Sequence, residues 1–521
     1  RIFLGDKEFN KKRYAKHLKN VVNNKICSTC KGQRLNSKIL SSKIMSKNIS
    51  DFTQMTIKEN LEFLNKLEDP TAKYIIDPLK KQLEALEYIG LSYLTLNRVT
   101  TTLSGGEAQR LKLIRHLNSS LSDLVYIIDE PSVGLHPEDI AKINEILKSL
   151  KEKGNTVLIV EHDPDVIKEG DYIIDMGPGS GKNGGEITFE GTYNELLSSN
   201  TSTGNALRNK HNLKENIREA NHFYNIGPVT QNNLNNVKTS IPKHVLTVLT
   251  GVAGSGKSTL VKAGFENNDH TIFIDQKAVQ GSNRSNLLTY LGVFDSVRSY
   301  FSKETGLNKA MFSYNSKGAC PNCGGKGYIK TELAFMGDFS QTCEVCHGKR
   351  YKQEVLDATI DGYSIADVLN LTVDEGIIFF DKKNDIKSKL QSVSKTGLNY
   401  MSLGQPLSTL SGGEIQRVKL GQHLDEEIKN SIFIFDEPTT GLHESDIPIL
   451  MECFDDLIDQ NNTVILIEHN LSIMCEADWI IDVGPGPGLD GGKVQFSGTP
   501  KNFIDSSETL TSKHLKRYIK Q

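Results

Sequence analysis

The chain has 521 residues, a formal net charge of -3, and 37% hydrophobic and 24% charged residues. This length exceeds what one hydrophobic core organises and predicts several domains. No apolar run approaches the roughly 20 residues that cross a bilayer, so we expect a cytoplasmic protein without a membrane partner. The charge excludes binding of nucleic acid through an overall positive field, so any DNA contact needs a local basic patch.

An internal repeat organises the chain. The octet that begins with the pair Cys27 and Cys30 recurs at Cys343, 316 positions later. Further along, the segment Leu103–Arg110 matches Leu410–Arg417 with an offset of 307 positions. A single length difference of nine residues between these features accounts for both offsets. The chain therefore consists of two homologous halves.

Short strands and longer helices alternate in both halves. Each half has one β-rich apolar run before Asp-Glu-Pro and another before Glu-His: Leu124–Ile128, Thr156–Val160, Ile432–Phe435 and Thr463–Ile467. Helical stretches such as Glu107–Asn118 and Ala141–Lys153 lie between such runs. This alternation predicts an α/β fold with parallel strands. The polar stretch Ser198–Leu213 is expected to link the halves.

The second half contains a phosphate-binding sequence, Gly251–Ser258, which is a complete G-x-x-x-x-G-K-S loop after the apolar run Val245–Leu249. Backbone N–H groups of such a loop can face phosphates, the lysine can reach the β and γ oxygens, and the serine can hold Mg²⁺. The loop occurs once in the chain. The predicted ATP and Mg²⁺ contacts are Gly251, Gly254, Ser255, Gly256, Lys257, Ser258 and Thr259.

Polar residues at strand ends complete the chemistry of an ATPase. Asp436 can orient Mg²⁺, Glu437 can polarise the attacking water, and His469 can sense the γ-phosphate. Gln276, after the run Ile272–Ile274, can reach the metal or the water. The first half carries equivalents of three of them: Asp129, Glu130 and His162.

A Leu-Ser-Gly-Gly-Glu segment in each half predicts a second kind of phosphate contact. A serine and two glycines that open a helix present backbone N–H groups and the positive end of the helix dipole. One such segment would more often be only a helix cap. Two copies, each followed by Asp-Glu-Pro, favour nucleotide binding by Ser104, Gly105, Gly106, Ser411, Gly412 and Gly413.

Four cysteines in the second half have the spacing C-x2-C-x19-C-x2-C: Cys320, Cys323, Cys343 and Cys346. Four thiolates at this spacing predict a closed tetrahedral zinc site. The first half has only the pair Cys27 and Cys30, which does not complete such a site. Either its missing pair lies before Arg1, which we favour, or this half has lost its metal. The remaining cysteines, Cys453 and Cys475, are expected to be buried thiols.

Taken together, these motifs resemble the ABC ATPases and, within them, the UvrA family. The specific likeness combines the C-x-x-C modules, the Leu-Ser-Gly-Gly-Glu segments and two further repeated motifs: Gly134–His136 and Gly441–His443, and Gly177–Gly179 and Gly484–Gly486. The resemblance implies two ABC-type P-loop nucleotide-binding halves with inserted zinc-bearing signature domains. It also implies ATP hydrolysis, damage recognition on double-stranded DNA in nucleotide excision repair, a homodimer and a UvrB-like partner.

The resemblance further implies composite ATP sites. The residues around Lys257 would be completed by Ser104, Gly105 and Gly106 of the first half. Asp129, Glu130 and His162 would work with Ser411, Gly412 and Gly413, and we expect the phosphate loop of this second site before Arg1. The zinc-bearing insertion would face DNA through the basic residues Lys317, Lys326, Lys330, Lys349, Arg350 and Arg284.

One departure from the family pattern leaves an alternative open. The connection from Lys257 to Gln276 is shorter than in a typical repair UvrA. It is more similar to UvrA-like paralogues that act as ATPases in drug or antibiotic tolerance without excision.

The expected segments are 1–95, signature domain of half 1; 96–200, its ATP-binding core; 201–235, linker and start of half 2; 236–295 and 401–521, ATP-binding core of half 2; and 296–400, its zinc-bearing signature domain.

Overall fold

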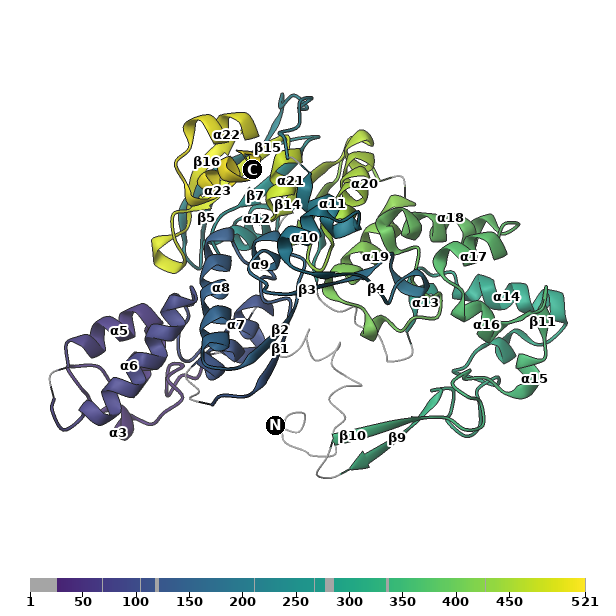
Figure 1. Cartoon of the computed structure of the whole chain (residues 1–521), viewed down its shortest axis with the longest axis horizontal. Helices are drawn as coiled ribbons and strands as arrows, with labels where there is room; N and C mark the ends of the chain where they lie inside the picture. Colours follow the sequence, from purple (N-terminus) through teal and green to yellow (C-terminus); the bar gives the residue numbers. More distant parts are fainter. Residues whose placement is uncertain are drawn as a thin grey trace. The chain divides into compact units, whose positions relative to one another are not determined.

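The computed structural model describes residues 26–67, 69–103, 105–117, 121–209, 211–266, 268–276, 285–333, 337–426 and 428–520. The chain forms two compact units, and Figure 1 labels their elements. The first unit comprises Arg1–Glu87 and Leu91–Thr102, and the second comprises Tyr88–Gly90 and Leu103–Gln521.

The first unit is helical where it is described. Its elements are α3 (Ser37–Leu40), α4 (Ile49–Gln54), α5 (Ile57–Asn65), α6 (Lys73–Tyr88) and the 3-10 turn η1 (Thr100–Thr102). Thr56 and Glu59 cap the start of α5 reciprocally through side chain and backbone, which satisfies amide groups that have no partner inside the helix. The apolar residues Ile57, Leu61 and Leu64 of α5 are buried.

The second unit begins with the ATP-core elements of half 1. These are α7 (Gly105–Leu117), β1 (Val125–Asp129), α8 (Pro137–Glu152), β2 (Thr156–Val160), α9 (Pro164–Ile167), β3 (Ile173–Gly177), η2 (Gly181–Asn183), β4 (Glu186–Gly191), α10 (Tyr193–Ser198) and α11 (Ser202–Arg208). Strands β1 and β2 pair in parallel, whereas β3 and β4 pair antiparallel. Parallel pairing brings the ends of β1 and β2 to the same edge.

Half 2 contributes a six-stranded sheet in the order β16-β15-β7-β14-β13-β8. Its strands are β7 (Leu246–Thr250), β8 (Thr271–Ile274), β13 (Ile432–Asp436), β14 (Thr463–Ile467), β15 (Trp479–Gly484) and β16 (Lys493–Gly498). All neighbours pair in parallel except β15 and β16. The central strands are buried on both faces, as expected for a parallel sheet, and their carboxyl ends meet at one edge.

Two hydrophobic cores flank this sheet. Phe433 and Phe435 of β13 face one core, whereas Ile432 and Ile434 face the other, because side chains alternate along a strand. The first core receives α20 (Ile447–Asp459), α21 (Leu471–Glu476), α22 (Pro500–Ser506) and α23 (Leu510–Lys520). The second receives α12 (Lys257–Phe265) and the hairpin of β5 (Phe223–Gln231) and β6 (Leu234–Pro242). The turn η6 (Glu444–Asp446) precedes α20, and the turn η7 (Gly488–Asp490) lies between β15 and β16.

A separate hydrophobic cluster organises the insertion between β8 and β13. Its helices are α13 (Leu287–Tyr290), α14 (Phe294–Thr305), α15 (Gln353–Leu356), α16 (Ile365–Asn370), α17 (Val373–Phe379), α18 (Asn384–Val393) and α19 (Gly412–Leu424), with the turns η3 (Lys309–Phe312), η4 (Ser394–Leu398) and η5 (Leu407–Thr409). Two antiparallel hairpins complete it: β9 (Tyr328–Leu333) with β10 (Gly337–Thr342), and β11 (Thr359–Ile360) with β12 (Tyr363–Ser364). Figure 1 shows β9 and β10 as an arm.

The structure confirms the expected α/β fold, and the predicted strands agree with the observed ones within one or two residues at each end. Residues 201–235, interpreted as linker and start of half 2, contain α11 and β5. In β5 only Ile226 and Val229 are buried, so the sequence pattern of this strand is weak. The division into six segments stays a prediction. Among the described residues, none of the helices has the length and apolar composition needed to cross a lipid bilayer.

Candidate functional site

The phosphate loop follows β7 and ends at Ser258, the second residue of α12. Gly251 has φ +130°, and a Cβ there would lie 2.0 Å from the Val483 carbonyl oxygen, so only glycine fits. Lys257 Nζ donates to the carbonyl oxygens of Gly251, at 2.7 Å, and Val252, at 3.0 Å. Burial lowers the pKa of Lys257 to about 8, an effect that the nearby carboxylate of Glu437 opposes. A buried cation beside an N–H-rich loop suits a phosphate.

A second glycine-rich loop and the β5–β6 turn support the phosphate loop. The backbone N–H of Gly488 donates to the Gly254 carbonyl at 3.0 Å. The amide of Asn233 donates to the carbonyls of Gly254, at 3.3 Å, and Gly488, at 3.1 Å. The hydroxyl of Ser255 is buried and has no hydrogen-bond partner among the described residues. This fixed backbone with an unpaired donor is consistent with a site shaped for a ligand.

Oxygen atoms next to the loop could hold Mg²⁺. Ser258 Oγ on α12 donates to Asp436 Oδ1 at the end of β13, at 3.3 Å. The other oxygen of Asp436 pairs with Lys262 at 3.3 Å. A hydroxyl and a carboxylate beside bound phosphates are ligands that Mg²⁺ prefers. The donor set therefore fits the predicted cation.

Glu437 is a buried carboxyl group at the site. It has φ +54° and lies directly after β13. Burial, with the carboxylates of Asp436 and Glu468, raises the pKa of Glu437 to about 7. Gln276 Nε2 donates to the Glu437 carbonyl at 3.2 Å and to Thr440 Oγ1 at 3.0 Å. A carboxyl group with a pKa near 7 suits a general base.

His469 follows β14 and closes the other side of the site. Glu468 fixes the local backbone, because its carboxylate accepts hydrogen bonds from the N–H groups of Thr439 and His469 at 3.0 and 2.7 Å. Complete burial lowers the pKa of His469 well below its ordinary value, so the ring is neutral. Its Nδ1 is buried without a hydrogen-bond partner in the described part of the chain. The structure thus brings together Lys257, Ser258, Asp436, Glu437, His469 and Gln276.

The equivalent residues of half 1 also lie close together. His162 Nε2 is 3.7 Å from Glu130 Oε1, directly after the paired strands β1 and β2 that end at Asp129 and Val160. Burial raises the pKa of Glu130 from its ordinary value. The predicted set Asp129, Glu130 and His162 is therefore assembled.

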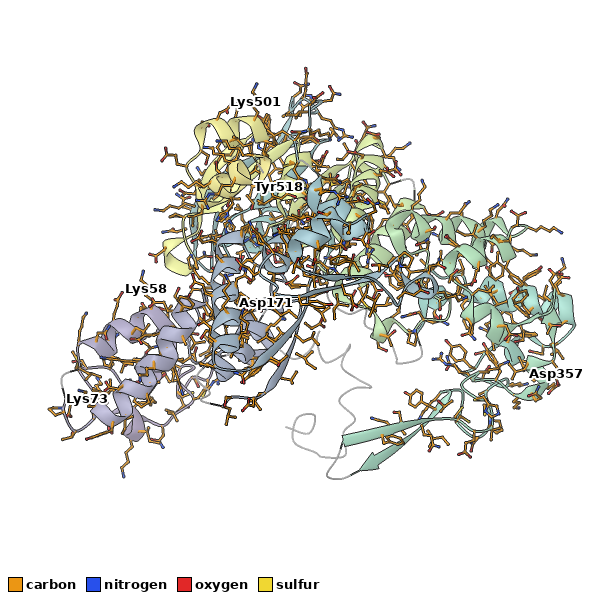
Figure 2. All side chains as sticks on the ribbon, in the orientation of Figure 1. Lys58, Lys73, Asp171, Asp357, Lys501 and Tyr518 are labelled. Carbon is orange, nitrogen blue, oxygen red and sulfur yellow. The ribbon has the colours of Figure 1, made fainter. Side chains whose placement is uncertain are left out.

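The loops after the two Asp-Glu-Pro motifs pack against each other reciprocally. A Cβ on Gly134 of half 1 would lie 2.8 Å from Glu437 Oε2, and a Cβ on Gly441 of half 2 would lie 3.4 Å from Glu130 Oε1. A cavity of about 160 Å³ lies between these loops, and Tyr518, labelled in Figure 2, lines it. Each half therefore reaches the carboxylate of the other.

The Leu-Ser-Gly-Gly-Glu segments open helices, as expected. Ser411 Oγ accepts from the Glu414 N–H at 3.2 Å, and the carboxylate of Glu414 accepts from the Ser411 N–H at 2.8 Å, so Gly412 and Gly413 start α19 in a capping box. Ser104 lies outside the described residues. Gly105 and Gly106 begin α7, whose Arg110 is close enough to lower the pKa of Glu437 against the effect of burial.

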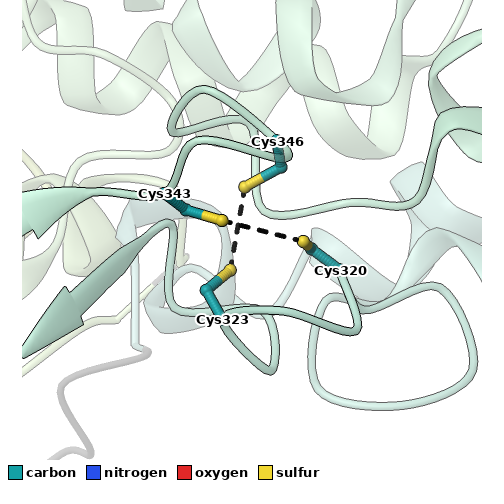
Figure 3. A group of neighbouring side chains, drawn as sticks. All are labelled: Cys320, Cys323, Cys343 and Cys346. Atoms are coloured by element: carbon teal, nitrogen blue, oxygen red, sulfur yellow. Dashed lines mark hydrogen bonds between the residues drawn. The ribbon is translucent and has the colours of Figure 1, made fainter.

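The four predicted zinc ligands converge, as Figure 3 shows. Their sulfur atoms all lie within 4.8 Å of one another, with Cys320 and Cys343 at 4.0 Å and Cys323 and Cys346 at 3.7 Å. Zn–S bonds of about 2.3 Å in a tetrahedron give S···S edges of about 3.8 Å, so this geometry fits zinc. The backbone N–H of Cys346 and other donors lower the pKa of Cys343 to about 6.

The cysteine pair of half 1 has the same backbone turn. The N–H of Lys31 donates to the Cys27 carbonyl at 2.8 Å, and the N–H of Gln33 donates to the Cys30 carbonyl at 2.8 Å. In half 2 the same bonds join His347 to Cys343 and Lys349 to Cys346, each at 2.8 Å. The backbone N–H of Cys30 lowers the pKa of Cys27. This pair therefore has the shape of half a thiolate site.

The predicted DNA-facing residues lie around the cysteine cluster. Lys317, Lys326, Lys330 and Lys349 are exposed. Lys349 pairs with Asp367 at 3.6 Å, and the Arg350 guanidinium lies 5.2 Å from the ring centre of Tyr314. Arg284 lies outside the described residues. Among the described basic residues of this set, only Lys330 lies on the β9–β10 hairpin, and the others lie near the four cysteines in the sequence.

Sequence reasoning assigned no role to several residues that the structure places at the site. Asn233 supports the phosphate loop, Gly134 touches Glu437, and His136 is fully buried beside His469. The sequence does single out Gly134 and His136, because the motif Gly-Leu-His recurs after each Asp-Glu-Pro. For Asn233 no repeated motif offered a comparable signal.

Comparisons with known proteins agree with this geometry. The family model described as ABC transporter matches residues 234–440. The chain is 42% identical over 533 residues to UvrABC system protein A of Clostridium perfringens, covering 95% of this chain and 57% of that protein. It is 40% identical over 556 residues to UvrABC system protein A of Aquifex aeolicus, covering 99% of this chain and 60% of that protein. The chain thus spans less than two thirds of the length of these relatives.

A solved structure is also similar throughout. The crystal structure of UvrA2 from Deinococcus radiodurans superimposes with a TM-score of 0.92 at 36% identity, covering 99% of this chain and 69% of that one. Likeness at this level extends over the nucleotide site and the cysteine module alike.

Proposed function

Since this chain belongs to the UvrA family, we propose that it is an ATP-hydrolysing, DNA-binding protein that recognises damage for nucleotide excision repair. The observation that carries the proposal is one compact unit with both an assembled phosphate-loop site and a four-cysteine module, similar to UvrA proteins over at least 95% of the chain. ATP, Mg²⁺ and Zn²⁺ are the proposed cofactors, and the proposed compartment is the cytoplasm.

We assign the steps of ATP hydrolysis to the half-2 residues. When ATP binds, the ammonium of Lys257 exchanges its two loop carbonyls for phosphate oxygens. Ser258 and Asp436 would hold Mg²⁺, which would neutralise part of the phosphate charge. Glu437 accepts a proton as the water oxygen bonds to the γ-phosphorus, and the bond from that phosphorus to ADP breaks. Gln276 and His469 orient the water and the γ-phosphate.

We propose that both ATP sites are composite. Ser104, Gly105 and Gly106 of half 1 complete the site around Lys257, which the proximity of Arg110 to Glu437 supports. The reciprocal site pairs Asp129, Glu130 and His162 with Ser411, Gly412 and Gly413. That site also requires a second phosphate loop, and this sequence contains one such loop.

The zinc-bearing insertion is proposed as the contact with double-stranded DNA. Zinc held by four thiolates would fix the base of the β9–β10 hairpin, so that Lys317, Lys326, Lys330, Lys349 and Arg350 present positive charge on one module. Contacts to phosphates would be independent of sequence and sensitive to salt, and damage would be sensed through altered deformability. Arg284 belongs to this proposal by sequence alone. A homodimer and a UvrB-like protein are the proposed partners.

Duplex binding tests this function. Fluorescence anisotropy would compare a lesion-containing and an undamaged duplex, with and without Mg-ATP, over a salt series. We expect tighter binding to the lesion, an effect of nucleotide on that preference, and weaker binding as salt rises. Binding that ignores lesion and nucleotide, together with normal ATP hydrolysis, would favour the tolerance-type paralogue instead.

A further inference from the structure

Two histidines after the Asp-Glu-Pro motifs have no role in the chemistry above. His136 of half 1 is fully buried and caps α8, where its Nδ1 accepts the N–H of Glu138 at 3.2 Å. The ring proton is therefore on Nε2, which lies 3.0 Å from Thr511 Oγ1 of α23 in half 2. Burial lowers the pKa of His136 to about 3, so the ring is a neutral donor at physiological pH. The contact joins residues 375 positions apart.

The hydrogen bond continues to the strand beside the phosphate loop. Thr511 Oγ1 donates to Asp482 Oδ1 at 3.3 Å. Asp482 is buried on β15 and lies opposite Thr250, the last residue of β7. Its Oδ1 is 3.1 Å from the position of a Cβ on Gly251, the first loop residue. A continuous path thus leads from a half-1 loop to the backbone that holds ATP phosphates.

His136 also packs directly against His469 of half 2. Its ring packs edge to face on His469, with centroids 6.0 Å apart and planes at 90°. On its other side the ring packs on His514, whose Nε2 lies 3.1 Å from Glu138 Oε2. Figure 1 places α8 beside α23, in agreement with these contacts. A displaced His136 ring would therefore disturb both the backbone next to the phosphate loop and the packing of His469.

The same device recurs in the opposite direction. His443 Nδ1 accepts the Ser445 N–H at 3.2 Å, and His443 Nε2 lies 3.0 Å from Thr203 Oγ1 of α11. Thr203 donates to Asp175 Oδ1 at 2.7 Å. The His443 ring packs edge to face on His162 at 6.2 Å. Both threonines lie in a T-x-T-x-x-x-L sequence, and the two histidines and two aspartates each differ by the repeat offset of 307.

Helix capping alone does not account for this arrangement. Capping uses only Nδ1, whereas Nε2 of each histidine is directed at a threonine of the other half that itself bonds a strand aspartate. We propose that His136, Thr511 and Asp482 form a positioning relay through which half 1 holds the phosphate loop and His469 of the half-2 ATP site in their working geometry. His443, Thr203 and Asp175 form the reciprocal relay. This inference deepens the proposed function and rests on the ATPase activity it includes.

Threonine substitutions in the full chain test the relay. Thr511→Val removes the hydroxyl at nearly constant shape, Thr511→Ser restores it, and Thr203→Val makes the same deletion in the other relay. Steady-state ATP hydrolysis and binding of a fluorescent ATP analogue would be measured, with thermal unfolding to verify folding. For Thr511→Val we expect kcat to fall about tenfold with KM within about twofold, as one lost buried hydrogen bond predicts. Thr511→Ser should keep kcat within about twofold. Thr203→Val should lower kcat less than Thr511→Val does, because the Thr203 relay serves the site for which this sequence contains no phosphate loop.

Unchanged kcat in Thr511→Val, an equal fall in both valine variants, or no rescue by serine would overturn the relay. Failure of the wild-type chain to hydrolyse bound ATP would instead refute the proposed activity. In that case nitrogen NMR of the His136 ring, identified by its loss in His136→Gln, decides the relay. Wild type and Thr511→Ser should give the signal of a neutral ring that is protonated on Nε2 from pH 5 to 8. In Thr511→Val the Nε2 signal should be shifted. An unshifted Nε2 signal in Thr511→Val would refute the relay.

Discussion

Replacing Glu437 with glutamine gives a two-part prediction from one buried carboxyl group. The pKa of Glu437 is raised from 4.5 to about 7, mainly by burial. Such a shift corresponds to about 2–4 kcal/mol of preference for the protonated form in the folded state. Glutamine has the same shape and no charge. Since the folded pKa lies above the unfolded one, wild type and Glu437→Gln should be similarly stable below about pH 4.5, and the wild type should lose stability relative to the variant as the pH rises toward 7.

Thermal or urea unfolding from pH 4.5 to 8 measures this difference. At pH 8 we expect Glu437→Gln to be about 2–4 kcal/mol more stable than wild type in the absence of nucleotide. Turnover should fall at least about a hundredfold while ATP still binds, because the general base is lost. Glu130→Gln is the matched control: 30% of the Glu130 side chain is exposed, so its stability gain should be smaller. A pH-independent difference, or full turnover by Glu437→Gln, would refute the reasoning.

Three further predictions concern packing, metal and DNA. Gly134→Ala should lower turnover and should reduce the free energy of unfolding more than Gly292→Ala does. Both glycines have a positive φ, but only the methyl group at position 134 would meet Glu437, at 2.8 Å. Equal effects of the two substitutions in unfolding and turnover assays would contradict this. Cys343→Ser should lose bound zinc, as measured by atomic absorption. Cys453→Ser should keep it, because Cys453 lies outside the cluster and its Sγ donates to the Lys395 carbonyl. Retained zinc in Cys343→Ser would exclude the four-thiolate site. Lys326→Glu should weaken duplex binding and reduce the salt slope by about 1, whereas Lys501→Glu should not; equal slopes in all three proteins would remove Lys326 from the interface.

Local patterns predicted most of the half-2 site. The loop Gly251–Ser258 needs particular residue types at fixed spacing, and Asp436 and His469 follow strands whose apolar runs are unmistakable. The four cysteines were equally predictable, because a zinc module is set by pairs close in sequence. In each case the residues that determine the geometry lie within a short segment.

Contacts between the halves were not predictable in this way. The partners His136 and Thr511 are 375 residues apart, and neither residue type indicates a partner by itself. The support of the phosphate loop by Asn233 depends on the β5–β6 hairpin, in which few buried residues mark the strands. Such contacts follow from how the two repeats pack, which sequence periodicity does not encode.

The most direct test of the account is the affinity ratio for lesion-containing over undamaged duplex, measured with and without Mg-ATP for wild type and Lys257→Ala. If ATP bound at the half-2 loop controls recognition by the zinc-bearing module, ATP should change this ratio severalfold in wild type and leave it unchanged in Lys257→Ala. A ratio of one in all four conditions, or the same response to ATP in both proteins, would contradict the coupling of this ATP site to damage recognition.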